Sequence, residues 1–527
     1  MDFQLDLIII IGYMLLVLAI GLWVGRKEKT SADYFLAGRS SPWWAIGASL
    51  FAANISSEHF IGLAGAGAHS GLAVGHFEWL ASLILLLLAW VFVPFYLSSK
   101  VFTVPEFLEK RFDSRSRTYL ATVSIIGYVL TKISVTLYAG GIVLKYVFGW
   151  DMMMAAIILV VVTGIYTVLG GLKSVIYTDV VQTVMLIAGA ALLTTLGLIQ
   201  VGGWSGLESR LDASFFDMWK PLEDPDFPWT GILFGAPILG IWYWCSDQFI
   251  VQRVLSANNI PIAQRGAIMA GFLKLLPVFI LVLPGLIARA LNPTIDGDTA
   301  YPWLVKELLP VGLRGLVMAA LLAALMSSLA SCFNSASTLF TIDFYKRIRP
   351  DAPEKKLILV GRLATVALVG LGILWVPLIP YISSKVYIYL QSVQAYISPP
   401  IAAVFLIGIF WPRSNASGAF AALLTGLVVG FARLILELLQ PDLGMFNGFI
   451  TMNFLHFAVM LFVLSSGVLV LVSLATAKPD PKVIGSLTWA GRSQDRVTLT
   501  RGLPETTNIV MSVVLVLLVL IGWFWFS

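Results

Sequence analysis

A run of polar residues interrupts an apolar segment near the start of the chain. Residues 54–59 read Asn-Ile-Ser-Ser-Glu-His, between the apolar stretches 43–51 and 60–66. An unpaired polar group in hydrocarbon is costly, so a lipid-facing helix has no reason to carry this cluster. The pattern predicts a broken helix that faces a water-accessible cavity, where freed carbonyls and polar side chains bind an ion and a solute.

A second polar cluster lies in a later apolar segment, where Ser327, Ser328 and Ser331 follow Ala324. On a helix, Ala324 and Ser328 share one face, as do Ser327 and Ser331. Two hydroxyls, a freed carbonyl and carbonyls from residues 52–55 offer hard, uncharged oxygens, which suit a weakly held monovalent cation. Small residues that allow close helix packing are the alternative explanation, and the broken helix favours the ion.

Two charged residues, Glu78 and Lys274, also fall inside apolar segments. Burying either charge unpaired is expensive, so we expect them to converge on a polar solute rather than act only as structural counter-charges. Gln391 adds an amide with donors and acceptors. Tyr243 can stack on the apolar face of a sugar, although aromatic residues are more often packing residues. His59 is as often a packing residue as a ligand contact.

The remaining intramembrane charges are interpreted as structural. Asp179 is expected to start a span on the cytoplasmic side, where it pairs with a cation or caps the helix. Asp247 and Arg253 are interpreted as charges at the intracellular end of the bundle. Lys132 lies in the middle of a span, and its position alone assigns it no role.

The composition places the chain among polytopic membrane proteins. Of its 527 residues 58% are hydrophobic and 12% are charged, and the mean hydropathy is +0.89, which excludes an ordinary soluble domain. The net charge of +5 gives no reason to expect nucleic-acid binding. Both cysteines lie in apolar segments, so we expect no disulfide framework.

Windows of about 20 apolar residues predict an all-α protein with about fourteen membrane spans. The weakest boundary is at 152–200, where Gly170-Gly171 is the only break. The predicted cores are 5–25, 43–66, 72–97, 117–147, 152–170, 175–200, 229–255, 264–290, 309–345, 358–380, 384–410, 416–438, 452–476 and 508–526.

Basic residues predict the orientation of these spans. Clusters such as Arg26–Lys29 and Lys346–Arg349 follow alternate spans, whereas the loops 201–228 and 291–308 are lean in Lys and Arg. The positive-inside rule makes the basic side cytoplasmic. Because the number of spans is even, we expect a multi-pass protein of the plasma membrane with both termini outside the cytoplasm.

The chain is expected to form one transmembrane transporter domain, 1–527, with an inverted repeat. The repeats are predicted at 43–200 and 229–410, with an extra N-terminal helix at 5–25 and additional C-terminal helices within 416–527. Each repeat holds five spans, an odd number, so the two enter the membrane from opposite sides. The second repeat is expected to open with a helix interrupted at Gly235, Pro237 and Gly240.

Several long strings resemble the solute:sodium symporter family, and within it the sodium/glucose cotransporter branch. The resemblance runs from about residue 10 to 480. It rests on Ile46–Phe51 through His59–Leu63, Trp242–Gln248, Gly312–Leu316 and Asn334–Thr341.

This resemblance implies a leucine-transporter-type fold with a 5+5 inverted repeat. It implies sodium coordination by the carbonyls of Ala52, Ile55 and Ala324 and by the hydroxyls of Ser327 and Ser328. It implies sugar contacts at Asn54, His59, Glu78, Lys274 and Gln391, with Tyr243 as the stacking inner gate. The outer hydrophobic gate it implies consists of Leu63, Phe77 and Tyr387.

Three positions depart from the family pattern. Gly240 and Ala81 stand where some sugar-transporting members place polar contacts, and Tyr387 replaces a Phe. These departures leave the choice among glucose, galactose and related polyols open.

The expected function is sodium-coupled import of a neutral hexose by alternating access, with a polyol such as myo-inositol as the alternative cargo. Sodium is the co-transported ion, and no catalytic activity and no obligatory protein partner are expected. A nutrient sensor would need a soluble signalling domain, and the longest hydrophilic stretch, about 478–507, is too short for one. A channel would need no contacts specific for an organic solute.

We also expect one sodium per sugar. The resemblance implies that family members using two sodium ions bind the second ion near the acidic residue that corresponds to Asp179. They also have a hydroxyl residue at position 330, where this chain has Ala330. Asp179 and Ser331 are present, but a methyl group cannot coordinate an ion.

Overall fold

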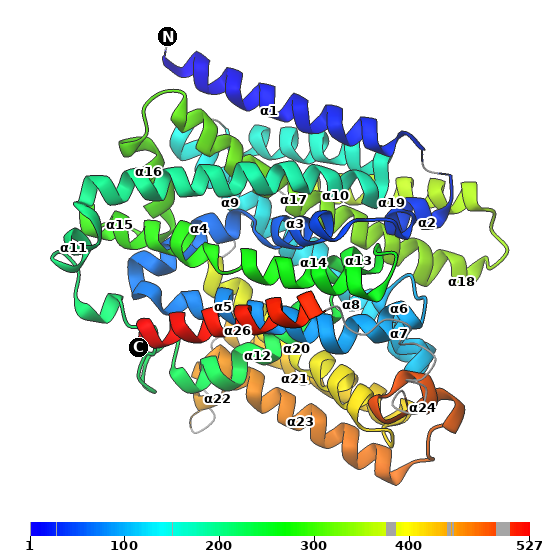
Figure 1. Ribbon diagram of the computed structural model, residues 1–527. Helices are drawn as coiled ribbons and strands as arrows, with labels where there is room; N and C mark the ends of the chain where they lie inside the picture. The colour runs from blue at the N-terminus through cyan, green and yellow to red at the C-terminus, as the bar shows by residue number, and fades with distance from the viewer. Residues whose placement is uncertain are drawn as a thin grey trace.

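The computed structural model describes residues 2–27, 29–149, 151–375, 386–439, 444, 447–491 and 506–527. Within these ranges the chain is built from helices, and its extended pairings are two isolated bridges. Most of the long helices run in roughly the same direction across the view of Figure 1 and form one bundle. The predicted all-α fold class is confirmed.

The helices are bounded as follows. They are α1 (Asp2–Val24), α2 (Ser31–Leu36), α3 (Trp43–Asn54), α4 (Ser57–Ser70), α5 (His76–Leu87), α6 (Val93–Ser98), α7 (Val104–Arg111), α8 (Ser114–Gly127), α9 (Ser134–Phe148), α10 (Met152–Val201), α11 (Gly203–Glu208), α12 (Ala236–Gly240), α13 (Gln248–Leu255), α14 (Ile260–Leu273), α15 (Leu283–Leu291), α16 (Ala300–Leu308), α17 (Leu313–Leu339), α18 (Lys346–Ile348), α19 (Glu354–Trp375), α20 (Val386–Phe410), α21 (Ala416–Leu439), α22 (Asn447–Thr451), α23 (Phe454–Ala475), α24 (Pro481–Leu487) and α26 (Thr506–Trp525). Wider π-helical turns occur at η4 (Leu88–Phe92), η5 (Tyr128–Ile133), η7 (Gly231–Gly235), η8 (Ile241–Ser246), η9 (Val278–Val282) and η11 (Phe340–Tyr345).

Ten stretches in the described part of the chain are long and apolar enough to cross a membrane. Two of them, Ser57–Ser98 with 42 residues and Ala156–Val201 with 46, are about twice the length of one crossing. Gly231–Ser246 is a shorter apolar helix. These lengths are compatible with the predicted fourteen spans, and the exact count stays a prediction. Residues 376–385, where the predicted spans 358–380 and 384–410 meet, lie outside the described residues.

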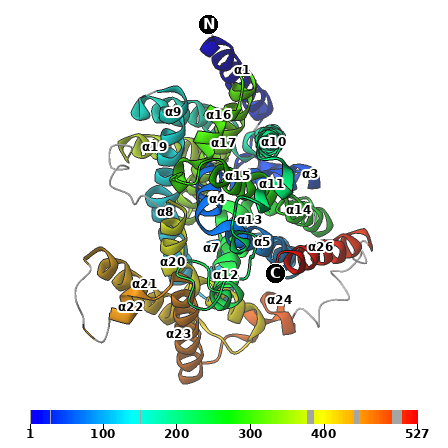
Figure 2. The ribbon, with the colours of Figure 1, turned by 90° about the vertical axis from the view of Figure 1, so that its left-hand side faces the viewer.

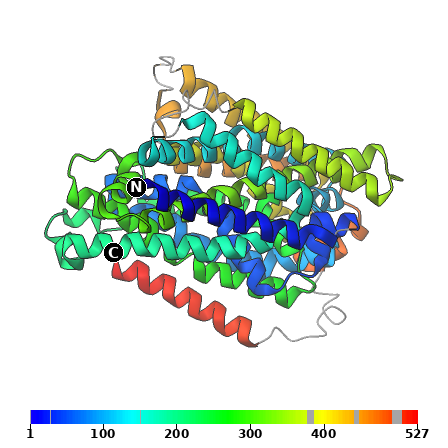
Figure 3. The ribbon, with the colours of Figure 1, turned by 90° about the horizontal axis from the view of Figure 1, so that it is seen from above.

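The bundle has a buried centre and a lipid-facing periphery. In the most apolar window of α17, 94% of the residues are buried, whereas in that of α26 the share is 17%. Figure 2, which looks at the bundle end-on, places α4, α13 and α17 in its middle and α1, α21, α23 and α26 toward its edges. Both termini lie at the same end of the bundle in Figures 1 and 3, as an even number of crossings requires.

The predicted interruption near residue 54 is present. Helix α3 ends at Asn54, Ile55 and Ser56 are extended, and α4 begins at Ser57. Ser56 caps the new helix, because its hydroxyl accepts the Glu58 N–H at 3.3 Å. The Ser56 N–H donates to His59 Nδ1 at 3.3 Å, which closes a reciprocal capping box.

The second interruption is not where the sequence pattern placed it. Pro237 and Gly240 lie inside the helical stretch formed by η7, α12 and η8, whose wide turns absorb the missing hydrogen bond of proline. The helix breaks instead at Asp247, which is extended with φ −82° and ψ 126°. The prediction of an interruption at Gly235, Pro237 and Gly240 is therefore wrong in position by several residues.

The long helix α10 corresponds to two predicted spans. Its direction changes at Gly171, which adopts φ 48° and ψ −154°, a conformation that side chains disfavour. The predicted break at Gly170-Gly171 is thus located correctly. Asp179, however, does not start a helix: it lies within α10 and is fully buried.

Candidate functional site

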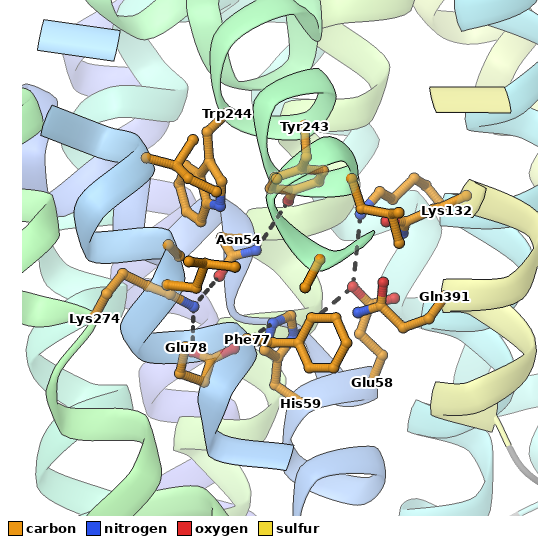
Figure 4. Close-up of a pocket in the computed structure, with 17 residues that line it drawn as sticks. Asn54, Glu58, His59, Phe77, Glu78, Lys132, Tyr243, Trp244, Lys274 and Gln391 are labelled. Atoms are coloured by element: carbon orange, nitrogen blue, oxygen red, sulfur yellow. Dashed lines mark hydrogen bonds and ion pairs between the residues drawn. The ribbon is translucent and has the colours of Figure 1, made fainter. Parts of the chain in front are cut away.

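Six residues expected to contact the solute line one cavity inside the bundle. About 570 Å³ of space, including the part open to solvent, lies between the lining residues. The predicted residues that line it are Asn54, His59, Glu78, Tyr243, Lys274 and Gln391. Figure 4 shows these side chains around the cavity, contributed by helices far apart in the sequence.

A continuous polar chain crosses one side of the cavity. Lys274 Nζ is hydrogen-bonded to Glu78 Oε2 and also donates to Asn54 Oδ1 at 2.6 Å. Asn54 Nδ2 in turn donates to the Tyr243 hydroxyl at 3.1 Å. Each of these groups therefore has its charge or dipole matched by a neighbour, and Lys274 lies where α14 ends.

His59 lies between two carboxylates. Its Nε2 is 3.7 Å from Glu78 Oε1, and its Nδ1 is 3.8 Å from Glu58 Oε1. Because Nδ1 accepts the Ser56 N–H, the neutral ring carries its proton on Nε2 and directs it toward Glu78. The capping box thus fixes both the orientation and the tautomer of His59.

Two further charged residues line the cavity, and the sequence analysis did not predict that either one contacts the solute. Glu58 and Lys132 both line it, with Lys132 Nζ 3.6 Å from Glu58 Oε1. Lys132 Nζ also lies 4.5 Å from the centre of the Tyr243 ring. Their charge could have identified both residues from the sequence, because a charged residue inside a membrane span generally marks a functional site.

One wall of the cavity is apolar. Ala81, Ile84, Leu239 and Gly240 line it, so the two departures from the family pattern face the cavity together. A Cβ atom at Gly240 would overlap Ile84 Cδ1, so the side chain of Ile84 fills the space that a larger residue would need.

The gate residues expected from the resemblance are only partly described. Phe77 lines the cavity, and Leu63 is fully buried on α4. The side chain of Tyr387 lies outside the described residues. The Tyr243 ring packs against those of Trp244 and Phe249, at centroid distances of 5.2 and 6.3 Å, and its role as the inner gate stays a prediction.

One of the predicted ion-binding groups, the Ser328 hydroxyl, lies at the end of α3. The Ser328 hydroxyl on α17 donates to the Ala53 carbonyl at 3.1 Å. Three predicted carbonyl ligands belong to fully buried residues. They are Ala52 in the last turn of α3, Ile55 directly after α3, and Ala324 on α17. The last carbonyls of a helix have no intrahelical partners, and α3 ends here, so carbonyl oxygens and a hydroxyl face one another.

Ser327 faces a buried ion pair instead. Its hydroxyl donates to Asp179 Oδ1 at 2.6 Å, and the Ser49 hydroxyl donates to Asp179 Oδ2 at 2.5 Å. Arg253 Nη2 lies 3.6 Å from Asp179 Oδ2 and is hydrogen-bonded to the Ser331 hydroxyl. Arg253 therefore lies against the oxygens that a second cation would need.

The donor set fits a monovalent ion better than a divalent one. Among the described residues, no group of three or more His, Cys, Asp or Glu side chains is arranged to hold a metal ion. Neutral hydroxyl and carbonyl oxygens give weak binding, which allows the ion to leave again.

A broken helix beside a polar cavity, within a bundle of membrane-spanning helices, defines an ion-coupled secondary transporter. The family model described as "Sodium:solute symporter family" matches residues 34–426. The chain belongs to the sodium:solute symporter family, and its relatives place it with the sodium/glucose cotransporter branch.

Three curated relatives illustrate the similarity. The sodium/glucose cotransporter 4 of Danio rerio is 42% identical over 94% of this chain and 82% of its own length. The sodium/mannose cotransporter of Bos taurus is 44% identical over 93% of this chain and 90% of its own. The sodium/myo-inositol cotransporter 2 of Sus scrofa is 41% identical over 96% of this chain and 82% of its own.

Two solved structures share the fold. A substrate-bound, outward-open Na⁺-coupled sialic acid symporter has a TM-score of 0.80 at 25% identity, over 90% of this chain and 99% of its own. A nucleobase-cation-symport-1 family transporter has a TM-score of 0.57 at 14% identity, over 86% and 97%. The fold is of the leucine-transporter type, and sodium is the co-transported ion.

Proposed function

We propose that the protein imports a neutral hexose of the glucose or galactose type, coupled to sodium, by alternating access. The observation that carries the proposal is the polar chain from Glu78 through Lys274 and Asn54 to Tyr243, at the edge of a cavity that apolar residues also line. Hydroxyl groups of a sugar can both donate to and accept from such a chain, and an aromatic ring can cover its C–H face.

The first break couples the two cargoes. The Ser328 hydroxyl bonds the last turn of α3, and Asn54 closes that turn and also bonds Lys274 in the cavity. Sodium bound to carbonyls of Ala52 and Ile55 would hold α3 against α17 and complete the solute site only when the ion is present. A polyol such as myo-inositol is the second candidate, because a relative named as its cotransporter is 41% identical to this chain.

The stoichiometry we propose is one sodium per sugar. The second-ion position would use Asp179 and Ser331, and the guanidinium of Arg253 contacts both of these residues. A second sodium would have to bind beside that cation, and Ala330 offers it no oxygen. One charge crossing 100 mV gives about 2.3 kcal/mol and a tenfold sodium gradient about 1.4 kcal/mol, enough to concentrate the sugar roughly 500-fold.

Uptake by proteoliposomes tests the proposal. Glucose, galactose, mannose, myo-inositol and a uronic acid compete against labelled hexose with and without a sodium gradient. We expect sodium-dependent uptake in which glucose or galactose competes most strongly. Strongest competition by myo-inositol would favour the polyol, and uptake without sodium would contradict the coupling. Reversal potentials give the ratio, and two sodium ions per sugar would refute the single-ion proposal.

The placement of the protein in the membrane is also part of the proposal. We infer that it lies in the plasma membrane with both termini outside the cytoplasm, and that residues 43–200 and 229–410 are the inverted repeats. Selective labelling of a cysteine added after Ser527 by an impermeant reagent in intact cells tests the orientation. Labelling only after permeabilisation would overturn it.

A further inference from the structure

The cavity contains a carboxylate whose oxygens have no hydrogen bond. Glu58 is 2% exposed, and its Oε2 has no hydrogen-bond partner among the described residues. Its Oε1 is 3.6 Å from Lys132 Nζ and 3.8 Å from His59 Nδ1, and both distances exceed those of an N–H···O hydrogen bond. A buried charge in this condition is costly unless a donor arrives from elsewhere.

Neither neighbour is placed to supply that donor. His59 Nδ1 accepts the Ser56 N–H, so in the neutral ring it offers Glu58 a lone pair and not a proton. The ammonium of Lys132 lies over the rings of Tyr243 and Phe249, 4.5 and 5.3 Å from their centres. Lys132 thus balances the charge of Glu58 from a distance and leaves Glu58 Oε2 without a hydrogen bond.

The other carboxylate of the cavity is in the opposite condition. Glu78 Oε2 is bonded to Lys274, which is itself bonded to Asn54. In Figure 4 the two ion pairs lie on opposite sides of the cavity, Lys274 with Glu78 on the left and Lys132 with Glu58 on the right. The cavity therefore has one closed charged end and one end that lacks a donor.

We propose that Glu58 is a second solute-binding carboxylate, whose free oxygen accepts a hydrogen bond from a solute hydroxyl at the end of the cavity opposite Glu78. Lys132 is a positioning residue that holds Glu58 in place. The inference rests on the proposed function and narrows the solute to a neutral polyhydroxylated ring with hydroxyl donors at both ends. A solute with a carboxylate at this end would face Glu58, and the nearby ammonium of Lys132 is already paired.

The test measures sodium-dependent binding of hexose and of its monodeoxy analogues to the full-length protein in nanodiscs. Wild type, Glu58→Gln and Glu58→Ala are compared, with Glu437→Gln as the control because Glu437 lies on α21 and pairs with Arg433 outside the cavity. We expect the Ala variant to bind the parent hexose roughly 10- to 100-fold more weakly, the range of a hydrogen bond to a charged group, and the Gln variant to lie between.

The analogues separate contact from scaffold. One monodeoxy analogue, lacking the hydroxyl that meets Glu58, is expected to bind wild type and Glu58→Ala equally. An equal loss for every analogue would overturn the proposal and make Glu58 structural, as would no loss for any. Glu58→Gln is nearly isosteric, so it keeps the test decisive if the Ala variant does not fold.

Lys132 variants provide the second measurement. Lys132→Met is expected to weaken the same hydroxyl contact and spare the same analogue, and Lys132→Arg is expected to restore part of the affinity. An effect of Lys132→Met on all analogues alike would contradict its role in positioning Glu58. Failure of the proposed function gives a different result, because wild type would then show no sodium-dependent binding of any hexose.

Discussion

The two interrupted helices that face the cavity leave their backbone groups in different conditions. At the first break, the Ala53 carbonyl accepts the Ser328 hydroxyl and the Phe51 carbonyl accepts the Ile55 N–H, while Ser56 and His59 cap the start of α4. At the second break, Asp247 Oδ1 accepts the Phe249 N–H at 3.0 Å and is hydrogen-bonded to the Tyr128 hydroxyl. At the second break the Tyr96 hydroxyl also donates to the Cys245 carbonyl at 2.5 Å, while Asp247 Oδ2 has no hydrogen-bond partner among the described residues.

The difference shows how one helix interruption can serve two cargoes. A helix ends with partial negative charge at its carbonyls and begins with partial positive charge at its N–H groups. The carbonyl end of α3 therefore favours binding of sodium. The N–H groups at the start of α4 favour the acceptor side chains of Glu58 and His59, which lie in the first turn of that helix. At the second break the Cys245 carbonyl already accepts the Tyr96 hydroxyl, so we expect this break to support the bundle rather than to bind sodium.

Removing the hydroxyl at the first break is expected to have the largest effect. Ser328→Ala removes one proposed sodium ligand and should raise the half-maximal sodium concentration for uptake by about tenfold or more, from about 1.5–3 kcal/mol for a hydrogen bond to a charged group. The measurement is hexose uptake as a function of sodium concentration. Ser337→Ala is the matched control, because Ser337 lies on the same helix and bonds the Asn334 carbonyl. An unchanged sodium dependence in Ser328→Ala would exclude this serine as a ligand.

Neutralising Glu78 in its ion pair with Lys274 is expected to lower the affinity for the sugar and not the affinity for sodium. Glu78→Gln weakens a charge-assisted contact, so sugar affinity should fall roughly ten- to a hundredfold. Equilibrium binding at saturating sodium measures the loss, and Ser82→Ala is the control because Ser82, on the same helix, bonds the Gly271 carbonyl. If Glu78→Gln instead lowers thermal stability and leaves sugar affinity unaltered, the pair is structural.

The contrast between the breaks also shows what the sequence could predict. The polar run 54–59 identified the first break, because so many polar groups have no other reason to lie in hydrocarbon. Gly235, Pro237 and Gly240 gave a wrong position for the second, because wide helical turns accommodate proline and glycine without breaking the helix. Asp247 breaks the helix without either residue type, because its side chain caps α13 by accepting the Phe249 N–H.

The same limit applied to the buried charges. Glu78 and Lys274 were expected to meet at a polar solute because each alone is too costly to bury; they pair with each other beside the cavity, and their contact with a solute stays a prediction. The partner of Asp179 could not be predicted from the sequence, because Arg253 lies 74 positions away on α13, which the second break orients. Lys132 could be placed within a membrane span from the sequence, but its partner Glu58 could not be predicted.

Breaking the second interruption should affect stability more than binding. Tyr128→Phe removes the hydroxyl that bonds Asp247 and leaves the Phe249 N–H contact in place. We expect a loss of about 1–3 kcal/mol in the free energy of unfolding and a lower melting temperature, with sodium and sugar affinities within about twofold of wild type. Thermal unfolding in detergent and equilibrium binding measure both. A sodium requirement raised as strongly as in Ser328→Ala would mean that the two breaks act alike.

The smallest effect is expected at the apolar wall, where the helix before the second break meets α5. A Cβ atom at Gly240 would overlap Ile84 Cδ1, the flexible end of a side chain, so Ile84 has to shift into the cavity. Overpacking costs about 1–3 kcal/mol, and we expect the low end of that range here. A cost of about 1 kcal/mol corresponds to sugar binding roughly fivefold weaker in Gly240→Ala. Adding Ile84→Val, which lacks that terminal methyl, should restore most of the affinity, whereas Ile84→Val alone should change it little. If the double variant binds as weakly as Gly240→Ala, the loss arises from the helix backbone and not from the shape of the wall.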